Sequence, residues 1–137
     1  MELRKTFRFE ASHILPKHKG KCSRLHGHSW VLHVFVEGVV NEETGFVMDY
    51  AEISEVVKPL IEALDHRHLG AFPQDTLLLW KPEGPDISYP DDIYPSSENL
   101  LIWIGSKLYN LQWSKLALEE TCTSYCELTR DEFERIT

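Results

Sequence analysis

The chain has 137 residues, 42% of them hydrophobic and 26% charged, which fits one globular domain and excludes wholesale disorder. Asp and Glu total 22 against 14 Lys and Arg, so the formal net charge is −8. An acidic balance of this size argues against sequence-independent binding to nucleic acid or to anionic membranes, because both require a basic face.

The apolar pattern and the cysteines favour a protein that stays inside the cell. No apolar run approaches the roughly 18 residues that cross a bilayer, and the N-terminus has no apolar core of the signal-peptide type. The three cysteines are irregularly spaced and do not make a disulfide framework. We therefore expect a reduced, cytoplasmic protein.

Two long strands and a helix are expected in the first half of the chain. Residues 3–13 alternate, and their apolar face is made by Phe7, Phe9, Ala11 and His13. Residues 14–25 form a loop. Residues 26–38 form a second strand, whose inner face carries His26, His28, Trp30, Leu32, Val34 and Val36. Asp49 is placed to cap a helix with an apolar stripe of Ile53, Val56, Val57, Leu60, Ile61 and Leu64.

A second helix, two shorter strands and a charged tail are expected in the second half. Ser96 or Ser97 caps the helix, whose apolar face is Leu100, Leu101, Ile104, Leu108 and Leu111. Residues 115–122 and 125–129 are read as strands. This order of elements, joined by short links, predicts a single α+β domain over residues 1–137. In such a domain an antiparallel sheet carries both helices on one side.

A proline-rich insertion interrupts this pattern at about residues 70–95. It contains five of the seven prolines of the chain. A loop of this length in a small domain is usually functional or mobile. It could cover a site, extend an oligomer contact or only decorate the surface.

Three histidines are candidates for a metal site. His26 and His28 share a face of one strand because side chains repeat every two residues, and His13 ends the preceding strand on its apolar face. Three neutral imidazoles that converge suit zinc, and they leave a fourth position for water or substrate, as in catalytic sites. The alternative is three unrelated histidines, some in the core and some at the surface.

Cys22 and the pair Asp65–His66 are candidates for proton transfer. Cys22 lies four residues before His26 among Lys and Arg side chains, a setting that favours the thiolate. The alternative is a small buried residue or an idle surface thiol. Asp65 precedes His66 at the end of the first helix, and an adjacent carboxylate can orient and charge an imidazole. Adjacency in sequence does not show that the two groups touch, and cationic capping of the helix C-terminus is the alternative.

Glu120 is a candidate for ligand binding. It shares the expected inward face of Leu116, Leu118 and Cys122, where a carboxylate without a partner is costly. A ligand that presents two parallel N–H donors would satisfy it. The alternative is that a β-bulge turns Glu120 outward and leaves Glu119 inside. Cys122 and Cys126 are interpreted as core or strand-end residues.

Six segments together resemble the family of 6-pyruvoyltetrahydropterin and 6-carboxytetrahydropterin synthases. The resemblance runs from Phe7 to about Leu128, and it is specific because all six segments occur in order, although each alone is weak. The segments are Phe9-Glu10-Ala11-Ser12-His13, Cys22-Ser23-Arg24-Leu25-His26-Gly27-His28-Ser29, Gly45-Phe46-Val47-Met48-Asp49-Tyr50, Leu64-Asp65-His66, Ser96-Ser97-Glu98-Asn99 and Glu120-Thr121-Cys122-Thr123.

The resemblance implies a T-fold, in which a four-stranded antiparallel sheet carries two helices on one face. Trimers of such units form a barrel, and two trimers stack into a hexamer. The resemblance also implies a role for each candidate residue. It implies that zinc binds to His13, His26 and His28 and that Cys22 is the proton-abstracting thiolate. It implies that Asp65 and His66 form a proton relay, contributed by a neighbouring subunit. It also implies that Glu120 binds the pterin ring, with help from Ser96 and Ser97.

Two details resemble the carboxytetrahydropterin branch of the family. The first is the spacing Cys-x3-His-Gly-His, because in the pyruvoyl branch the cysteine typically lies six residues before the first histidine. The second is the ending Glu-Thr-Cys-Thr. The resemblance therefore implies conversion of 7,8-dihydroneopterin triphosphate to 6-carboxy-5,6,7,8-tetrahydropterin, with loss of triphosphate and acetaldehyde. This reaction is an early step towards queuosine and related deazapurines.

Two alternatives and one open point accompany this interpretation. The chain could be a 6-pyruvoyltetrahydropterin synthase, or a zinc- or pterin-binding module without catalysis. The basic side chains of the first loop could attract a triphosphate, although a solvated loop is the default interpretation. These side chains are Lys17, Lys19, Lys21 and Arg24.

Overall fold

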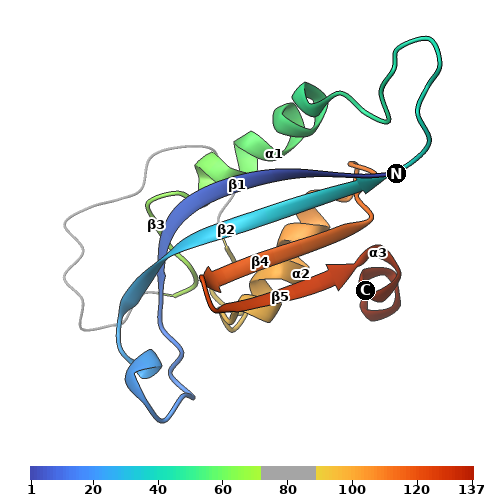
Figure 1. Cartoon of the computed structure of the whole chain (residues 1–137). Coiled ribbons are helices and arrows are strands. Elements are labelled where there is room, and N and C mark those ends of the chain that lie inside the picture. Colours follow the sequence, from blue (N-terminus) through green and yellow to red (C-terminus); the bar gives the residue numbers. More distant parts are fainter. Residues whose placement is uncertain (72–88) are drawn as a thin grey trace.

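The computed structural model describes residues 1–71 and 89–137, so most of the predicted insertion at about residues 70–95 lies outside the described residues. The fold is a five-stranded sheet in the order β3-β1-β2-β4-β5, combined with helices (Figure 1). The strands are β1 (Glu2–His13), β2 (His26–Glu37), β3 (Arg67–His68), β4 (Lys115–Thr121) and β5 (Ser124–Thr129).

The β1–β2 hairpin confirms both of the long strands predicted from alternation. The two strands pair antiparallel along their whole length, from Glu2 opposite Glu37 to His13 opposite His26. Every second side chain points to the same face of the sheet. The inner face is buried on both strands, and its largest residues are Phe7, Phe9, Trp30, Leu32 and Val34.

Helices α1 (Tyr50–Leu64) and α2 (Ser97–Lys107) pack on one face of the sheet, as predicted (Figure 1). The Asp49 carboxylate caps α1 by accepting a hydrogen bond from the Ala51 amide. Ser96, rather than Ser97, caps α2. The apolar face predicted for the second helix is buried throughout. In the first helix, Val56 was predicted to belong to the apolar stripe, but its side chain is 43% exposed. None of the helices in the described ranges is long and apolar enough to cross a bilayer.

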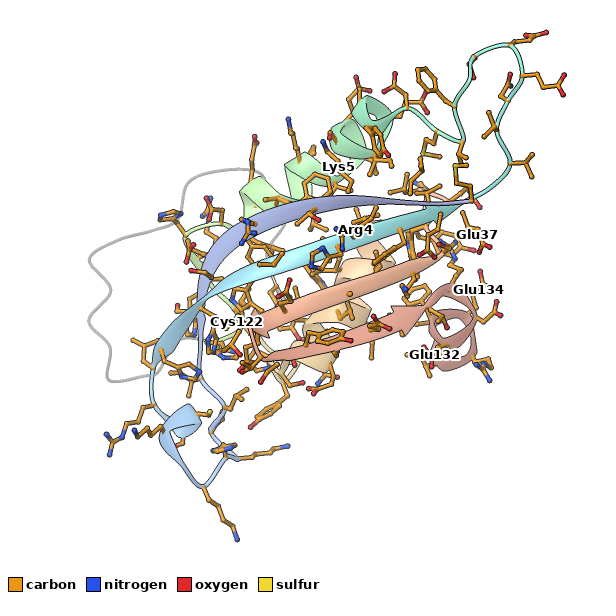
Figure 2. The ribbon with its side chains drawn as sticks, viewed as in Figure 1. Arg4, Lys5, Glu37, Cys122, Glu132 and Glu134 are labelled. Atoms are coloured by element: carbon orange, nitrogen blue, oxygen red, sulfur yellow. The ribbon has the colours of Figure 1, made fainter. Side chains whose placement is uncertain are left out.

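Three features differ from the sequence-based expectations. The two-residue strand β3 pairs parallel with β1 and so adds a fifth strand to the four antiparallel ones. The charged tail forms helix α3 (Arg130–Ile136), because Thr129 and Glu132 make a capping box and Phe133 is buried. Cys122 is exposed in the turn between β4 and β5, since the strand ends at Thr121 before alternation can place the thiol inside (Figure 2).

Candidate metal centre and active site

The side chains of His13, His26 and His28 converge at one end of the β1–β2 hairpin. The strand register produces this arrangement, because it sets His13 opposite His26 and Ala11 opposite His28. One ligand atom from each imidazole lies within 4.8 Å of the other two. The three ring centroids are 4.6 to 5.1 Å apart. The alternative of three unrelated histidines is therefore wrong.

The orientation of two of these rings is set by backbone carbonyl groups. The Nδ1 atom of His13 lies 2.7 Å from the Pro95 carbonyl oxygen, and Nδ1 of His26 lies 2.6 Å from the Arg24 carbonyl oxygen. Because a carbonyl oxygen only accepts hydrogen bonds, each Nδ1 carries the proton and donates it. The Nε2 atom of each ring is then left with a free lone pair.

The three Nε2 atoms are suited to a metal ion. All are buried and have no hydrogen-bond partner within the parts of the chain that the structure describes. A buried polar atom without a partner is costly. Three convergent imidazole lone pairs, two of them on rings whose other nitrogen donates to a carbonyl, form the donor set that zinc and similar ions prefer. The residues present therefore fit a bound metal.

Burial favours the neutral, metal-binding form of His13 and of His28. It lowers the pKa of His13, and the neighbouring rings of His26 and His28 lower it further, against the opposing effects of the Pro95 carbonyl and Glu120. Burial also lowers the pKa of His28, and there Glu120 again opposes the shift. The neutral form, which alone offers a lone pair, is thus favoured at neutral pH.

Glu120 and Glu119 lie on opposite faces of the sheet. Glu120 Oε1 is 3.4 Å from His28 Nε2, and the Glu120 side chain is 23% exposed. Glu119 Oε2 is 2.6 Å from Nε2 of His33, a residue on the other face of β2. The pairing of β4 with β5 shifts register between Glu119 and Thr121, yet Glu120 stays on the histidine face. The alternative in which a bulge turns Glu120 outward is therefore wrong.

Asp65 and His66 are in direct contact, which their adjacency in sequence did not establish. Asp65 Oδ2 lies 3.1 Å from His66 Nδ1, while Oδ1 accepts a hydrogen bond from the Glu10 amide. Burial acts to raise the pKa of the Asp65 carboxyl, but its hydrogen bonds with Glu10 and His66 outweigh that effect and lower the pKa.

The conformation around this dyad is unusual. His66 has φ +59°, a left-handed conformation rare outside glycine, and its amide donates to the Glu10 carbonyl at 2.6 Å. The His66 side chain is 79% exposed. The Asp65 carboxylate therefore orients an imidazole that faces outward and is open to another molecule.

Cys22, Ser96 and Ser97 lie in segments next to the triad. Cys22 is half-buried in a short 3₁₀ turn (η1, Lys21–Ser23) within the loop that joins His13 to His26. Ser96 follows Pro95, and its hydroxyl accepts from the Asn99 amide at the start of α2. Within residues 1–71 and 89–137, no hydrogen bond or ion pair joins Cys22 or the Asp65–His66 dyad to the three histidines.

A cavity lies beside the segment that follows His13, although none of the three histidines lines it. Its volume is about 400 Å³, within the range of small-molecule sites, and Ile14, Tyr94 and Pro95 are among the residues that line it. Pro95 is also the residue whose carbonyl orients His13. The sequence offered no signal for this role of Pro95, because a backbone carbonyl acts through its position and not through the identity of its side chain.

Comparisons with known proteins find similarity over nearly the whole chain. Residues 2–131 match the family model described as 6-pyruvoyl tetrahydropterin synthase. A 6-carboxy-5,6,7,8-tetrahydropterin synthase from Synechocystis is 38% identical over 128 residues, covering 88% of this chain and 86% of that protein. A dihydroneopterin monophosphate aldolase from Pyrococcus furiosus is 30% identical, covering 77% of this chain and 91% of that protein. The structure of 6-pyruvoyl tetrahydropterin synthase from Caenorhabditis elegans has a TM-score of 0.74 at 22% identity and covers 94% of each chain, which shows a shared fold.

Proposed function

Because the chain belongs to the 6-pyruvoyl tetrahydropterin synthase family, we propose that it is a zinc-dependent lyase of the 6-carboxytetrahydropterin synthase type. Its reaction would convert 7,8-dihydroneopterin triphosphate to 6-carboxy-5,6,7,8-tetrahydropterin and release triphosphate and acetaldehyde, a step towards queuosine. The observation that carries the proposal is the convergence of three buried Nε2 atoms that have no hydrogen-bond partner among the described residues.

His13, His26 and His28 would hold the zinc ion through Nε2. When bound, the ion would act as a Lewis acid toward the hydroxyl groups of the substrate side chain. The Pro95 and Arg24 carbonyls keep two of the rings in the required tautomer, so the protein supplies an ordered donor set before the metal arrives.

Proton transfer would be performed by Cys22 and by the Asp65–His66 dyad. The Cys22 thiolate would take a proton from the substrate side chain, since a positioned base is needed to start the elimination of triphosphate. The Asp65 carboxylate would hold the His66 ring and stabilise its charged form. The exposure of His66 supports a role at the site of a neighbouring copy of the chain.

Glu120 would anchor the pterin ring. A pterin presents an amino group and a ring N–H side by side, which match the two oxygens of one carboxylate. Glu120 is on the same sheet face as the triad, so a pterin held by its carboxylate would reach the metal centre. The Ser96–Ser97 segment, where α2 begins, would support the ring from the adjacent element.

The assembly and the pathway belong to the same proposal. We expect a homo-oligomer, in the form of a hexamer built from two trimeric barrels. Support comes from the two edges of the sheet, whose unpaired backbone groups can pair with another chain. Within the described residues, β5 pairs only with β4, and β3 covers only Ala11 and Ser12 on the outer side of β1. The three cysteines are free, which is consistent with the cytoplasmic location expected from the sequence.

Two other activities within the family would give different reaction products. A 6-pyruvoyltetrahydropterin synthase would eliminate triphosphate without releasing acetaldehyde. The similarity to a monophosphate aldolase raises a second possibility, cleavage of a dihydroneopterin phosphate with one phosphoryl group. The Cys-x3-His-Gly-His spacing and the 38% identity to a 6-carboxytetrahydropterin synthase favour the carboxy product over both.

The decisive experiment is incubation of the zinc-loaded chain with 7,8-dihydroneopterin triphosphate, with identification of every product by mass spectrometry. We expect 6-carboxytetrahydropterin, acetaldehyde and triphosphate in equal amounts. A pyruvoyl product without acetaldehyde, or turnover of the monophosphate alone, would contradict the proposal. Pterin binding without turnover would instead identify a binding module, and a Cys22→Ala variant is the matched inactive control.

A further inference from the structure

The loop between β1 and β2 is strongly basic in a protein that is acidic overall. Residues 14–25 contain four of the 14 Lys and Arg residues, together with His18, and none of the 22 Asp and Glu residues. The rest of the chain must therefore be more acidic than the net charge of −8 indicates. A local reversal of charge of this kind attracts anions to one place on the surface.

The position of the loop brings these charges next to the candidate metal centre. The loop starts after His13 and ends before His26, so two of the three metal-ligand candidates fix its ends. It projects beyond the sheet at the end of the hairpin that carries the triad (Figure 1). Nitrogen-tipped side chains extend from it into solvent (Figure 2). An anion held by the loop would lie beside the metal and would leave the metal ligands unchanged.

Hydrogen bonds within the loop give it a defined shape. The Leu15 amide donates to the Cys22 carbonyl at 2.9 Å and closes the loop, and the Ser23 hydroxyl donates to the Gly20 carbonyl at 2.8 Å. The Gly20 amide donates to Nδ1 of His18 at 2.9 Å. Since this Nδ1 accepts, the neutral His18 ring carries its proton on Nε2 and offers a further donor. Preorganised donors bind an anion at a lower entropic cost than mobile ones.

The charged side chains of the loop form no ion pair with a carboxylate in the described part of the chain. Among the residues that the structure describes, the side chains of Lys19, Lys21 and Arg24 form no ion pair, and all three residues are exposed. Lys17 lies over the Tyr94 ring at 5.2 Å, a contact that positions its ammonium group without neutralising it. Within residues 1–71 and 89–137, the loop therefore presents cations that form no ion pair.

We propose that residues 14–25 form the binding site for the triphosphate of the substrate, an inference that rests on the proposed function. A triphosphate ester carries several negative charges close together, and the loop offers a comparable number of cations on a short, ordered segment. Arg24 supplies a planar fork that can pair with two phosphate oxygens, while the lysines act as point charges. The loop also carries Cys22, so the triphosphate would be held on the same segment as the proposed base.

Binding of inorganic triphosphate to the metal-loaded chain tests this inference without requiring turnover. The double variant Lys19→Ala/Lys21→Ala is compared with Lys58→Ala/Lys107→Ala, which removes the same charge from the exposed parts of α1 and α2. We expect the loop variant to bind triphosphate at least about tenfold more weakly, with a smaller dependence of affinity on salt concentration. The control variant should bind triphosphate as the unaltered chain does, and inorganic phosphate should bind much more weakly than triphosphate.

Each outcome of this comparison has a defined meaning. Equal weakening of triphosphate binding in both variants would show a general charge effect and would overturn the inference. Unchanged triphosphate affinity in the loop variant would also overturn it, because triphosphate would then bind to the metal itself. A loop variant with unchanged KM for dihydroneopterin triphosphate would also overturn it while leaving the proposed function intact. Loop-dependent triphosphate binding in a chain that releases no pterin product would reject the proposed function and retain the polyphosphate site.

Discussion

The Ser12 hydroxyl lies 2.8 Å from Nδ1 of His68, a residue 56 positions further along the chain. Nε2 of His68 donates to the Ala71 carbonyl at 3.2 Å, so Nδ1 accepts and the Ser12 hydroxyl is the donor. This bond and the β1–β3 pairing fasten the segment that carries Asp65 and His66 to the strand that ends at His13. The proposed proton relay is therefore tied to the metal-ligand strand through a neutral hydrogen bond.

Removal of this hydroxyl should impair positioning of the dyad and leave the metal centre intact. We expect Ser12→Ala to lower kcat by about ten- to a hundredfold, because small displacements of a catalytic group have effects of this size. Zinc content and KM should change little, since Ser12 points away from the triad. Ser12→Thr keeps the hydroxyl and suits a strand, so it should restore most of the activity. Equal loss of activity in Ser12→Ala and Ser12→Thr would argue against a positioning role.

Zinc should bind at about one equivalent per chain, and His26→Ala or His28→Ala should abolish it. Each substitution removes one of three lone pairs that converge within 4.8 Å. His33→Ala is the matched control, because His33 lies on the same strand but faces the other side and pairs with Glu119. Metal analysis by mass spectrometry measures the zinc content. Unchanged zinc in both triad variants would require another metal site.

Cys22→Ala should retain the fold and the zinc but lose product formation by about 10²–10⁴-fold, the usual effect of removing a general base. Cys122→Ala is the control, since that thiol is exposed in the β4–β5 turn. Acetaldehyde release measures turnover. Near-normal release from Cys22→Ala would show that another group is the base.

Mixing two inactive variants tests whether the site spans two chains. Cys22→Ala and His66→Ala should each be inactive, and subunit exchange between them should restore part of the activity, because some sites then receive both intact groups. The exposure of the His66 ring motivates this expectation. If no activity returns after exchange has been verified by native mass spectrometry, the dyad acts within its own chain or has another role.

Glu120→Gln should weaken pterin binding by about 2–5 kcal/mol, because one acceptor of a charged bidentate pair becomes a donor that faces another donor. Zinc should stay in place. Glu119→Gln should have little effect on pterin affinity, since the Glu119 carboxylate is engaged with His33 on the opposite face. Titration with a pterin measures both affinities. A loss confined to Glu119→Gln would require the anchor to be reassigned.

Gly105→Ala should destabilise the fold by about 1–3 kcal/mol, the typical effect of overpacking a core. A Cβ atom at this position of α2 would lie 3.1 Å from Phe133 and 3.3 Å from Trp113, and both side chains are buried. The greater helix propensity of alanine offsets part of this loss. Chemical denaturation measures the free energy of unfolding. If the docking of α3 is the cause, Phe133→Leu combined with Gly105→Ala should cost less than the sum of the two single changes.

Local patterns in the sequence were sufficient to predict the long strands, the two main helices and the cap at Asp49, and they narrowed the cap of the second helix to Ser96 or Ser97. Alternation and helical periodicity depend on neighbours within a few residues, so they can be read without knowing the rest of the fold. The same period of two placed His26 and His28 on one face of β2 and separated Glu119 from Glu120. Alternation misplaced Cys122 because it carries no information on where a strand ends.

Contacts between distant segments were decided only by the tertiary structure. The register that sets His13 opposite His26, the Pro95 carbonyl that orients His13, and the Ser12–His68 bond each join residues far apart in the chain. The conversion of the charged tail into α3 likewise depends on burial of Phe133 against Trp113. Such contacts depend on how the sheet and helices pack together, and a local sequence pattern does not specify that packing.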